Sequence, residues 1–449
     1  MTRTPGAPAL PVALDRGAGT PLGTQLADQV RTRITSATLA AGTRLPSSRA
    51  LAAELGVARS VTEQAYAQLV AEGWLEGRHG SGTFVSATPP LAAPRPASRP
   101  ARDEPPLLRL STGTPWIDPA HAALWRRAWR EVSAARPPAG YDDPRGLREL
   151  RVALAERLAH VRGVVCDPDE VLLTAGTTEG LRHALGALPP GPVAVEDPGY
   201  RAAAATVAAT GRALHDVPAL EVPDLTGTVA VYVTPAHQHP LGRTMPGAHR
   251  AALLREARRA DALVIEDDYD SELRYDVAPV PALAGLDRER VVYLGTASKS
   301  VAPSMRLGWL VAPDGVREHV ERERAITHDS PPWPVQRALL ALLRDGYVDK
   351  VVRSARRVYA ERAARVVGAL APYGELTGPV AGMYATFVMP EEQARAAHAA
   401  GRAAGYDVPL LADQCRTHVQ HGLVVGFGGS LTDRQLDHAL AVTTRALRG

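Results

Sequence analysis

Residues 291–308 of this chain are VVYLGTASKSVAPSMRLG, in which an apolar run ends shortly before a lysine. Lysine is rare here, because Lys299 and Lys350 are the only lysines among 51 basic residues. An arginine side chain stays protonated, whereas a lysine amine can lose its proton and form a Schiff base with an aldehyde. We therefore predict that Lys299 is functional, and we interpret Lys350 as a product of composition drift.

Further apolar runs alternate with helical patterns from about residue 107 onward. Four of them have the length and composition of buried strands, at 171–173, 193–195, 229–233 and 263–265. One of the helices between them is marked by Leu147, Leu150, Leu154 and Leu158. Short unbroken apolar strands separated by helices indicate a largely parallel sheet with both faces covered. Residues 107–449 are therefore predicted to form an α/β domain.

The composition of the 449 residues, with 45% hydrophobic and 22% charged, is typical of a globular protein of two or three domains. We expect no membrane contact, because no apolar run reaches the roughly 18–20 residues of a span. The N-terminal residues lack a secretion signal, and Cys166 and Cys415 stand far apart in the chain. We therefore expect reduced thiols in the cytoplasm. A net charge of +3 permits nucleic-acid binding without arguing for it.

A second pattern occupies residues 21–86. Leu26, Val30 and Ile34 recur every four residues and indicate a helix. Ser47 is a candidate N-cap for a short helix that ends at Gly56. A third helix over 59–70 and two short extended pieces joined by a glycine-rich turn complete the order of a winged helix-turn-helix.

The segments that flank this pattern have a different composition. Residues 1–20 are predicted to be a loose tail. Residues 87–106 contain seven prolines without a hydrophobic pattern. We interpret them as a stiff, extended spacer between two domains.

The winged helix-turn-helix pattern predicts a set of DNA contacts. Its second helix would lie in the major groove, and its glycine-rich hairpin tip would approach phosphate closely. The predicted contacts are Arg44, Ser48, Arg49, Arg59, Ser60, Thr62, Gln64, Arg78, His79 and Gly80. The pattern alone leaves open a small helical bundle that contacts another protein.

The literal sequence of this segment resembles the GntR family of bacterial repressors and activators. The resemblance rests on LPSSRALA at 45–52, GVARS at 56–60, YAQLVAEG at 66–73 and GSGTFV at 80–85. It implies a double-stranded DNA operator as partner. One departure is Ala58, where the family usually has a serine that caps the recognition helix. Loss of such a cap costs about 1 kcal/mol, which Ser60 is a candidate to recover in part.

The residues around Lys299 meet the requirements of pyridoxal 5′-phosphate (PLP). This cofactor needs a lysine for its aldehyde, an acid at the pyridine nitrogen, an anion site for its phosphate and a flat side chain against its ring. Arg306, together with the hydroxyl groups of Ser298 and Thr296, suits a phosphate. The turn Gly176-Thr177-Thr178 leads from a strand into a helix and offers free N–H groups to the same anion.

The acid and the flat side chain are also present in the sequence. Asp267 and Tyr269 follow the predicted strand at 263–265, and Tyr200 follows the strand at 193–195. Each feature alone has an ordinary explanation: the glycine turn as a common strand-to-helix connection, the acidic residues as a solvated strand end, and Tyr200 as a residue at the edge of a cavity. Because all of them lie at the ends of parallel strands, where such folds place ligands, we predict one PLP site.

This part of the chain resembles the MocR/GabR regulators, which join a GntR-type DNA-binding domain to a domain with the fold of PLP-dependent aminotransferases. The resemblance rests on LGTASKSVAPSMRLG at 294–308, IEDDYDSE at 265–272, EDPGY at 196–200 and YDDPRGL at 141–147. It implies an aspartate aminotransferase-like α/β fold, a smaller C-terminal α+β subdomain at 320–449, and a homodimer.

The resemblance also implies roles for matching residues. Lys299 would carry PLP as an internal aldimine, Asp267 would pair with the pyridine nitrogen, and Tyr269 would bond the ring oxygen. Tyr200 would cover the ring. The phosphate would be held by Arg306, Ser298, Gly176, Thr177 and Thr178.

Several positions depart from the family pattern. Ala175 stands where the phosphate turn usually has serine, and Leu241 where threonine is common. His239 replaces a common aromatic residue, and it is either a pH-sensitive polar contact or a neutral packing histidine. Arg416 and Arg201 are the candidates for binding the carboxylate of an effector.

Three functions are compatible with these features. The first is a transcription regulator whose effector is PLP itself or an amino compound, which changes operator binding by favouring one of two protein shapes. The second is an active aminotransferase with a fused DNA-binding domain. The third is a structural dimer in which both sites have decayed. We favour the first, because a complete DNA-binding domain would be superfluous on a metabolic enzyme.

Overall fold

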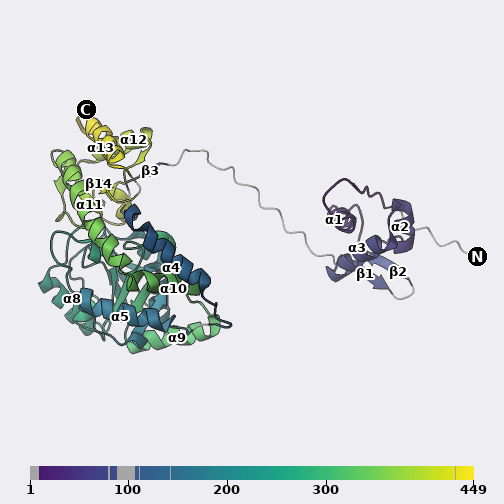
Figure 1. Ribbon diagram of the computed structural model, residues 1–449, viewed down its shortest axis with the longest axis horizontal. Coiled ribbons are helices and arrows are strands. Elements are labelled where there is room, and N and C mark those ends of the chain that lie inside the picture. Colours follow the sequence, from purple (N-terminus) through teal and green to yellow (C-terminus); the bar gives the residue numbers. More distant parts are fainter. Residues whose placement is uncertain are drawn as a thin grey trace, which may run out of the picture. The chain divides into compact units, whose positions relative to one another are not determined.

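The computed structural model describes residues 10–78, 81–87, 107–110, 112–141, 143–429 and 431–448 (Figure 1). The chain separates into two compact units, Met1–Asp103 and Glu104–Gly449, and each is described by itself. His79, Gly80 and the predicted spacer after Ala87 lie outside the described residues.

The N-terminal unit has three helices and a hairpin, namely α1 (Leu22–Thr35), α2 (Ser48–Leu55), α3 (Arg59–Ala71), β1 (Leu75–Arg78) and β2 (Gly82–Val85). The Ser47 hydroxyl accepts a hydrogen bond from the Ala50 N–H and so caps α2, as predicted. Helix α2 ends at Gly56, whose left-handed conformation suits glycine. The two strands pair antiparallel, and the apolar faces of all three helices form one core.

Part of the segment predicted as a loose tail packs against this core. Leu10 is buried among the side chains of the N-terminal unit. The Arg16 guanidinium donates a hydrogen bond to the Gly56 carbonyl, and the N–H groups of Ala13 and Asp15 donate to glutamines of α1. From Leu10 onward the structure therefore differs from the loose tail that composition suggested.

The larger unit is built on a sheet of seven strands. These are β4 (Val171–Thr174), β5 (Val193–Asp197), β6 (Leu214–Pro218), β7 (Ala230–Val233), β8 (Leu263–Asp268), β9 (Val291–Thr296) and β10 (Gly308–Val311). Their order is β4-β10-β9-β8-β7-β5-β6, and β10 alone among them runs antiparallel to its neighbours. All five predicted strands belong to this sheet, which confirms the largely parallel α/β architecture.

Helices cover both faces of the sheet, as Figure 1 shows. They are α4 (Ala122–Ala134), α5 (Arg148–Arg162), α6 (Thr177–Ala187), α7 (Arg201–Ala209), α8 (Gly247–Arg259), α9 (Asp314–Thr327) and α10 (Trp333–Arg344). Successive strand residues enter opposite cores: Leu172 packs with α6 and α7, whereas Val171 and Leu173 pack with α5 and α8. This alternation explains why the strands are apolar at every position.

The C-terminal part adds α11 (Tyr347–Leu370), α12 (Glu391–Ala403) and α13 (Asp433–Arg448) around the antiparallel strands β11 (Glu375–Leu376), β12 (Tyr384–Val388) and β14 (Gly422–Gly426). Strand β13 (Tyr406–Asp407) pairs with β3 (Leu108–Arg109), so the first described residues of this unit join its C-terminal part. Among the described residues, no helix is both long and apolar enough to cross a membrane.

Candidate functional site

Several strands of the large sheet end at one cavity. Its volume is about 100 Å³. The cavity is lined by Thr112, Gly113, Gly176, Thr177, Thr178, Tyr200, Tyr232, Thr234, His239, Asp267, Tyr269, Thr296, Ser298, Lys299 and Arg306. The structure thus brings together all ten residues that the sequence predicted for a cofactor.

Lys299 lies in the turn after β9, with its amine directed into the cavity. Its Nζ donates a hydrogen bond of 2.7 Å to the Gly113 carbonyl oxygen. Burial lowers the pKa of Lys299, although the carboxylates of Asp270 and Asp267 act in the opposite direction. A lowered pKa increases the fraction of neutral amine, which is the nucleophilic form.

Asp267, near the end of β8, has one satisfied and one unsatisfied oxygen. Its Oδ2 accepts a hydrogen bond of 2.5 Å from the Tyr232 hydroxyl. Its Oδ1 is buried without a hydrogen-bond partner among the described residues. Burial raises the pKa of this carboxyl to about 7, against the effect of the nearby Tyr232 and Thr177 hydroxyls. A buried acceptor without a partner fits a ligand that presents an N–H group, such as a protonated pyridine ring.

The opposite side of the cavity is suited to an anion. Gly176 has φ +99°, a conformation that favours glycine, and α6 begins after it without a side-chain cap. The first N–H groups of α6 are therefore available to a ligand. The Arg306 side chain lies beside this turn, and its guanidinium makes no hydrogen bond or ion pair with another described residue. A free guanidinium next to uncapped N–H groups fits a phosphate.

Arg306 itself adopts a strained backbone conformation. Its φ of 46° is in the left-handed region, which a non-glycine residue enters at a cost of about 1 kcal/mol. On the same side, the Thr296 hydroxyl donates to the Ser298 hydroxyl at 3.0 Å, so both predicted hydroxyl groups lie together. Such strain is typical of residues that are positioned for a ligand.

Aromatic rings form the remaining wall. His239 lies edge-on to Tyr200 and Tyr269, with ring centroids 5.8 and 6.2 Å away. Burial lowers the pKa of His239 to about 3, so the ring is neutral at ordinary pH, and it hydrogen-bonds the Gln414 side chain. The Tyr269 hydroxyl lies 2.9 Å from the His237 carbonyl oxygen and 2.9 Å from the Tyr384 hydroxyl, so hydrogen bonds to neighbouring residues fix its position.

The two candidates for a carboxylate contact lie outside the cavity lining. Arg416 Nε bonds Asp216 at 2.6 Å, and Nη2 donates to the Glu196 carbonyl oxygen at 2.7 Å. These bonds use Arg416 to hold the end of β5 against β6. Arg201 is exposed at the start of α7. Neither arginine is placed to meet a ligand in this cavity.

The sequence interpretation missed some lining residues. Tyr232 is the polar member of the apolar run that forms β7, and a tyrosine inside a buried strand was the available signal. Thr112 and Gly113 reach the cavity from a segment far away in sequence and carried no such signal.

In the N-terminal unit, most of the predicted DNA contacts that are described lie on the surface. Arg44, Arg49, Arg59, Ser60, Gln64 and Arg78 are exposed, and Ser48 is half-buried. Arg59 pairs with Glu63 at 2.8 Å, and the Arg78 guanidinium lies 4.6 Å from the Phe84 ring centroid. Helix α3 begins after Ala58 without a side-chain cap, so Ser60 does not replace the missing one.

Thr62 differs from this prediction. Its side chain is fully buried, and its hydroxyl donates to the carbonyl oxygens of Ser48 and Arg59. The reason is geometric: Thr62 lies on the same face of α3 as Ala65 and Leu69, which pack into the core. Thr62 therefore joins α2 to α3 and does not face outward.

Both units match known families. Residues 22–85 match the bacterial regulatory proteins of the gntR family, and residues 105–441 match aminotransferase class I and II. The pyridoxine biosynthesis transcriptional regulator PdxR of Corynebacterium glutamicum is 35% identical, over 93% of this chain and 94% of that protein. The probable rhizopine catabolism regulatory protein MocR of Rhizobium meliloti is also 35% identical, over 78% of this chain and 77% of that protein.

Solved structures match the larger unit. An archaeal alanine:glyoxylate aminotransferase aligns with a TM-score of 0.68 at 25% identity, covering 76% of this chain and 91% of that one. The kynurenine aminotransferase of Pyrococcus horikoshii aligns with a TM-score of 0.66 at 23% identity, covering 76% and 91%. These similarities show the aminotransferase fold, which implies PLP as the cofactor.

Proposed function

This chain belongs to the GntR-family transcription regulators of the MocR/PdxR type, which carry an aminotransferase-like domain, and we propose that PLP held at Lys299 controls its binding to an operator. The observation that carries this proposal is the cavity itself. It combines a lysine amine, a buried carboxylate oxygen without a partner and a free arginine beside an uncapped helix. These are the partners that an aldehyde, a pyridine nitrogen and a phosphate require.

Each lining residue has a separate task in this proposal. Lys299 would hold the cofactor covalently, and Asp267 would accept a hydrogen bond from the pyridine nitrogen while Tyr232 fixes its other oxygen. The phosphate would be held by Arg306, by the hydroxyl groups of Ser298 and Thr296, and by the turn at Gly176, Thr177 and Thr178. Tyr200 and the neutral His239 would enclose the ring. When bound, PLP supplies an aldehyde and an electron-withdrawing ring.

We further propose that PLP itself is the effector, in preference to an amino acid. An α-amino acid carries a carboxylate, which usually requires its own cation. Arg306 is the only arginine in the described lining, and the phosphate would occupy it, while Arg416 is committed to Asp216. The similarity to PdxR supports the same choice, since that relative is named for pyridoxine biosynthesis. This chain would then regulate genes of vitamin B6 supply in the cytoplasm.

The proposed DNA contacts are the exposed side chains of the N-terminal unit, chiefly Arg44, Arg49, Arg59, Gln64 and Arg78, with Ser48 and Ser60 at its surface and His79 and Gly80 at the predicted hairpin tip. A homodimer would present two such units to paired half-sites, as dimeric helix-turn-helix proteins do. PLP would act by binding one protein shape more tightly than the other.

The covalent bond gives a direct test, because the chain contains only two lysines. Wild-type protein is saturated with PLP, reduced with borohydride and digested, and the peptides are examined by mass spectrometry. We expect an adduct on Lys299 that is absent from Lys299→Ala and unchanged in the control Lys350→Ala. Lack of an adduct on Lys299 in the wild type would refute the proposal.

A second test separates the sensor from an aminotransferase. Operator fragments are selected from random DNA with the full chain, and their affinity is measured with and without PLP. We expect PLP to change that affinity in the wild type and not in Lys299→Ala. The visible absorption of PLP bound to Lys299 is followed in the same protein. If amino donors remove this absorption and oxo acids restore it at enzyme-like rates, the chain is instead an active aminotransferase.

A further inference from the structure

A buried arginine lies behind the phosphate side of the cavity. Arg324, on α9, has a completely buried side chain and does not line the cavity. Its Nη1 donates a hydrogen bond of 2.6 Å to the Leu173 carbonyl oxygen, near the end of β4. Its Nη2 lies 3.2 Å from Glu179 Oε2 and 3.0 Å from His183 Nε2.

Glu179 connects this arginine to the turn that would hold the phosphate. The same Oε2 accepts a hydrogen bond of 2.6 Å from the Ala175 N–H. Arg324 therefore contacts the strand before the turn directly and the turn itself through one carboxylate. Gly176 follows Ala175 at once, so these bonds fix the backbone from which the anion site is built.

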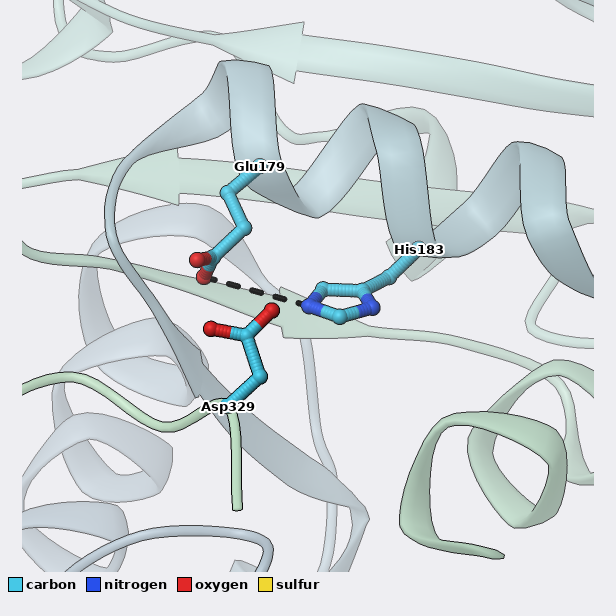
Figure 2. Close-up of side chains that lie close together, drawn as sticks. All are labelled: Glu179, His183 and Asp329. Carbon is cyan, nitrogen blue, oxygen red and sulfur yellow. Dashed lines mark ion pairs between the residues drawn. The ribbon is translucent and has the colours of Figure 1, made fainter. Parts of the chain in front are cut away.

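Figure 2 shows Glu179 and His183 projecting from the same face of α6 toward Asp329. Their potential ligand atoms lie within 4.8 Å of one another, which resembles a metal site. However, the guanidinium of Arg324 already donates to Glu179 and to His183. A permanent positive charge at these atoms disfavours a metal cation, so we interpret the cluster as an anchor for Arg324.

We propose that Arg324 is a positioning residue that sets the affinity for the phosphate of PLP through Glu179, an inference that rests on the proposed function. Two arginines thus flank one turn: Arg306 would contact the phosphate, and Arg324 would hold the backbone that contacts it. The position matters because residue 175 is alanine and has no hydroxyl to offer. The phosphate must then depend more on backbone N–H groups, whose direction is set by the shape of the turn.

The test compares PLP with pyridoxal, which lacks the phosphate. Removing one member of a buried ion pair leaves an uncompensated charge, whereas replacing both by apolar residues is often tolerated. The principal variant is therefore the double substitution Glu179→Met with Arg324→Met. The matched control is Arg322→Met, because Arg322 lies on the same helix with an exposed side chain paired to Glu318.

We expect the double variant to bind PLP about tenfold more weakly and pyridoxal within about twofold of the wild type. Pyridoxal should still give the borohydride-trapped adduct on Lys299, and the control should match the wild type for both ligands. If the double variant does not fold, Arg324→Lys replaces it, because lysine keeps the positive charge but cannot donate to several acceptors in one plane as a guanidinium does. This variant should weaken the binding of PLP, and not of pyridoxal, by a smaller factor.

Two results would overturn the inference while leaving the proposed function intact. One is unchanged affinity for PLP, and the other is an equal loss for PLP and pyridoxal, which would indicate general damage to the cavity. If the wild type forms no adduct with either ligand, the proposed function fails, and this inference fails with it.

Discussion

The outward-facing side chains of the N-terminal unit differ in kind from those of the cofactor cavity. Arg59 lies on the surface, with its side chain about two-thirds exposed and one ion pair to its neighbour Glu63. Asp267 is buried, held by Tyr232 from a neighbouring strand, and has a strongly raised pKa. Exposed charges are screened by solvent and salt, so removing one changes the free energy little. Removing one partner of a buried charged group costs several kcal/mol. We therefore expect graded effects at the DNA-binding surface and large effects in the cavity.

The largest effect concerns Asp267 in the ligand-free protein. The pKa of this carboxyl is about 7 in the folded state and near ~4 in the unfolded chain. Between these values the folded state holds a proton that the unfolded state lacks, so its free energy of unfolding falls as the pH rises and levels off above about 7. Asp267→Asn removes the cost of burying a charged carboxylate. As the pH rises from ~4 to about 7, the free energy of unfolding of this variant should therefore increase by on the order of a few kcal/mol relative to that of the wild type.

Urea unfolding of both proteins at several pH values measures this difference. Glu266 is also buried, with a pKa of about 7, but it is common to both proteins and cancels. The same variant should bind PLP less tightly, because an amide cannot accept the pyridine proton as a carboxylate does. A difference in stability that does not vary with pH would contradict the raised pKa.

The next effect tests the interior of the N-terminal unit. Thr62→Val keeps the shape of the side chain but removes hydrogen bonds to the Ser48 and Arg59 carbonyl oxygens. We expect the N-terminal unit to lose about 1–3 kcal/mol of stability, with operator affinity unchanged well below the unfolding temperature. Thermal unfolding and DNA titration measure the two quantities. Weaker DNA binding with unchanged stability would restore Thr62 as a DNA contact.

A smaller effect tests how far the phosphate turn is preorganised. Gly176 has φ +99° and ψ 175°, a region that is almost exclusive to glycine. Gly176→Ala should reduce PLP affinity by about tenfold, or roughly 1.4 kcal/mol, by distorting the turn. Gly211→Ala is the matched control, since Gly211 also has a positive φ but lies outside the cavity lining. Equal PLP affinity in both variants would show that the turn does not depend on this conformation.

The smallest effect is expected at the DNA-binding surface. Arg59→Ala should weaken operator binding by about 1 kcal/mol and lower the salt dependence by about one unit of slope. PLP binding should not change. Glu63→Gln provides the opposite case, because it releases Arg59 from its ion pair and should strengthen binding slightly. If Arg59→Ala has the same operator affinity as the wild type, our assignment of α3 as the recognition helix is wrong.

Much of the fold could be predicted because local chemistry is unambiguous here. Ser47 and Gly56 mark both ends of α2, and the five apolar runs all became strands of one sheet. Thr62 was misjudged because one polar residue on a helix does not reveal which face it occupies. The ion pair of Arg416 could not be foreseen, because its partner, Asp216, is 200 positions away in the sequence.

The sequence by itself determined the two kinds of domain and the residue types of the cavity, since periodicity, caps and a rare lysine are local signals. Only the tertiary structure decided which oxygen of Asp267 lacks a partner, that the Lys299 amine donates a hydrogen bond to the Gly113 carbonyl oxygen, and that Arg324 contacts Glu179 beside the turn at Gly176. The physical reason is that burial, pKa and hydrogen-bond satisfaction depend on neighbours from distant segments. Those neighbours are defined only when the chain has folded.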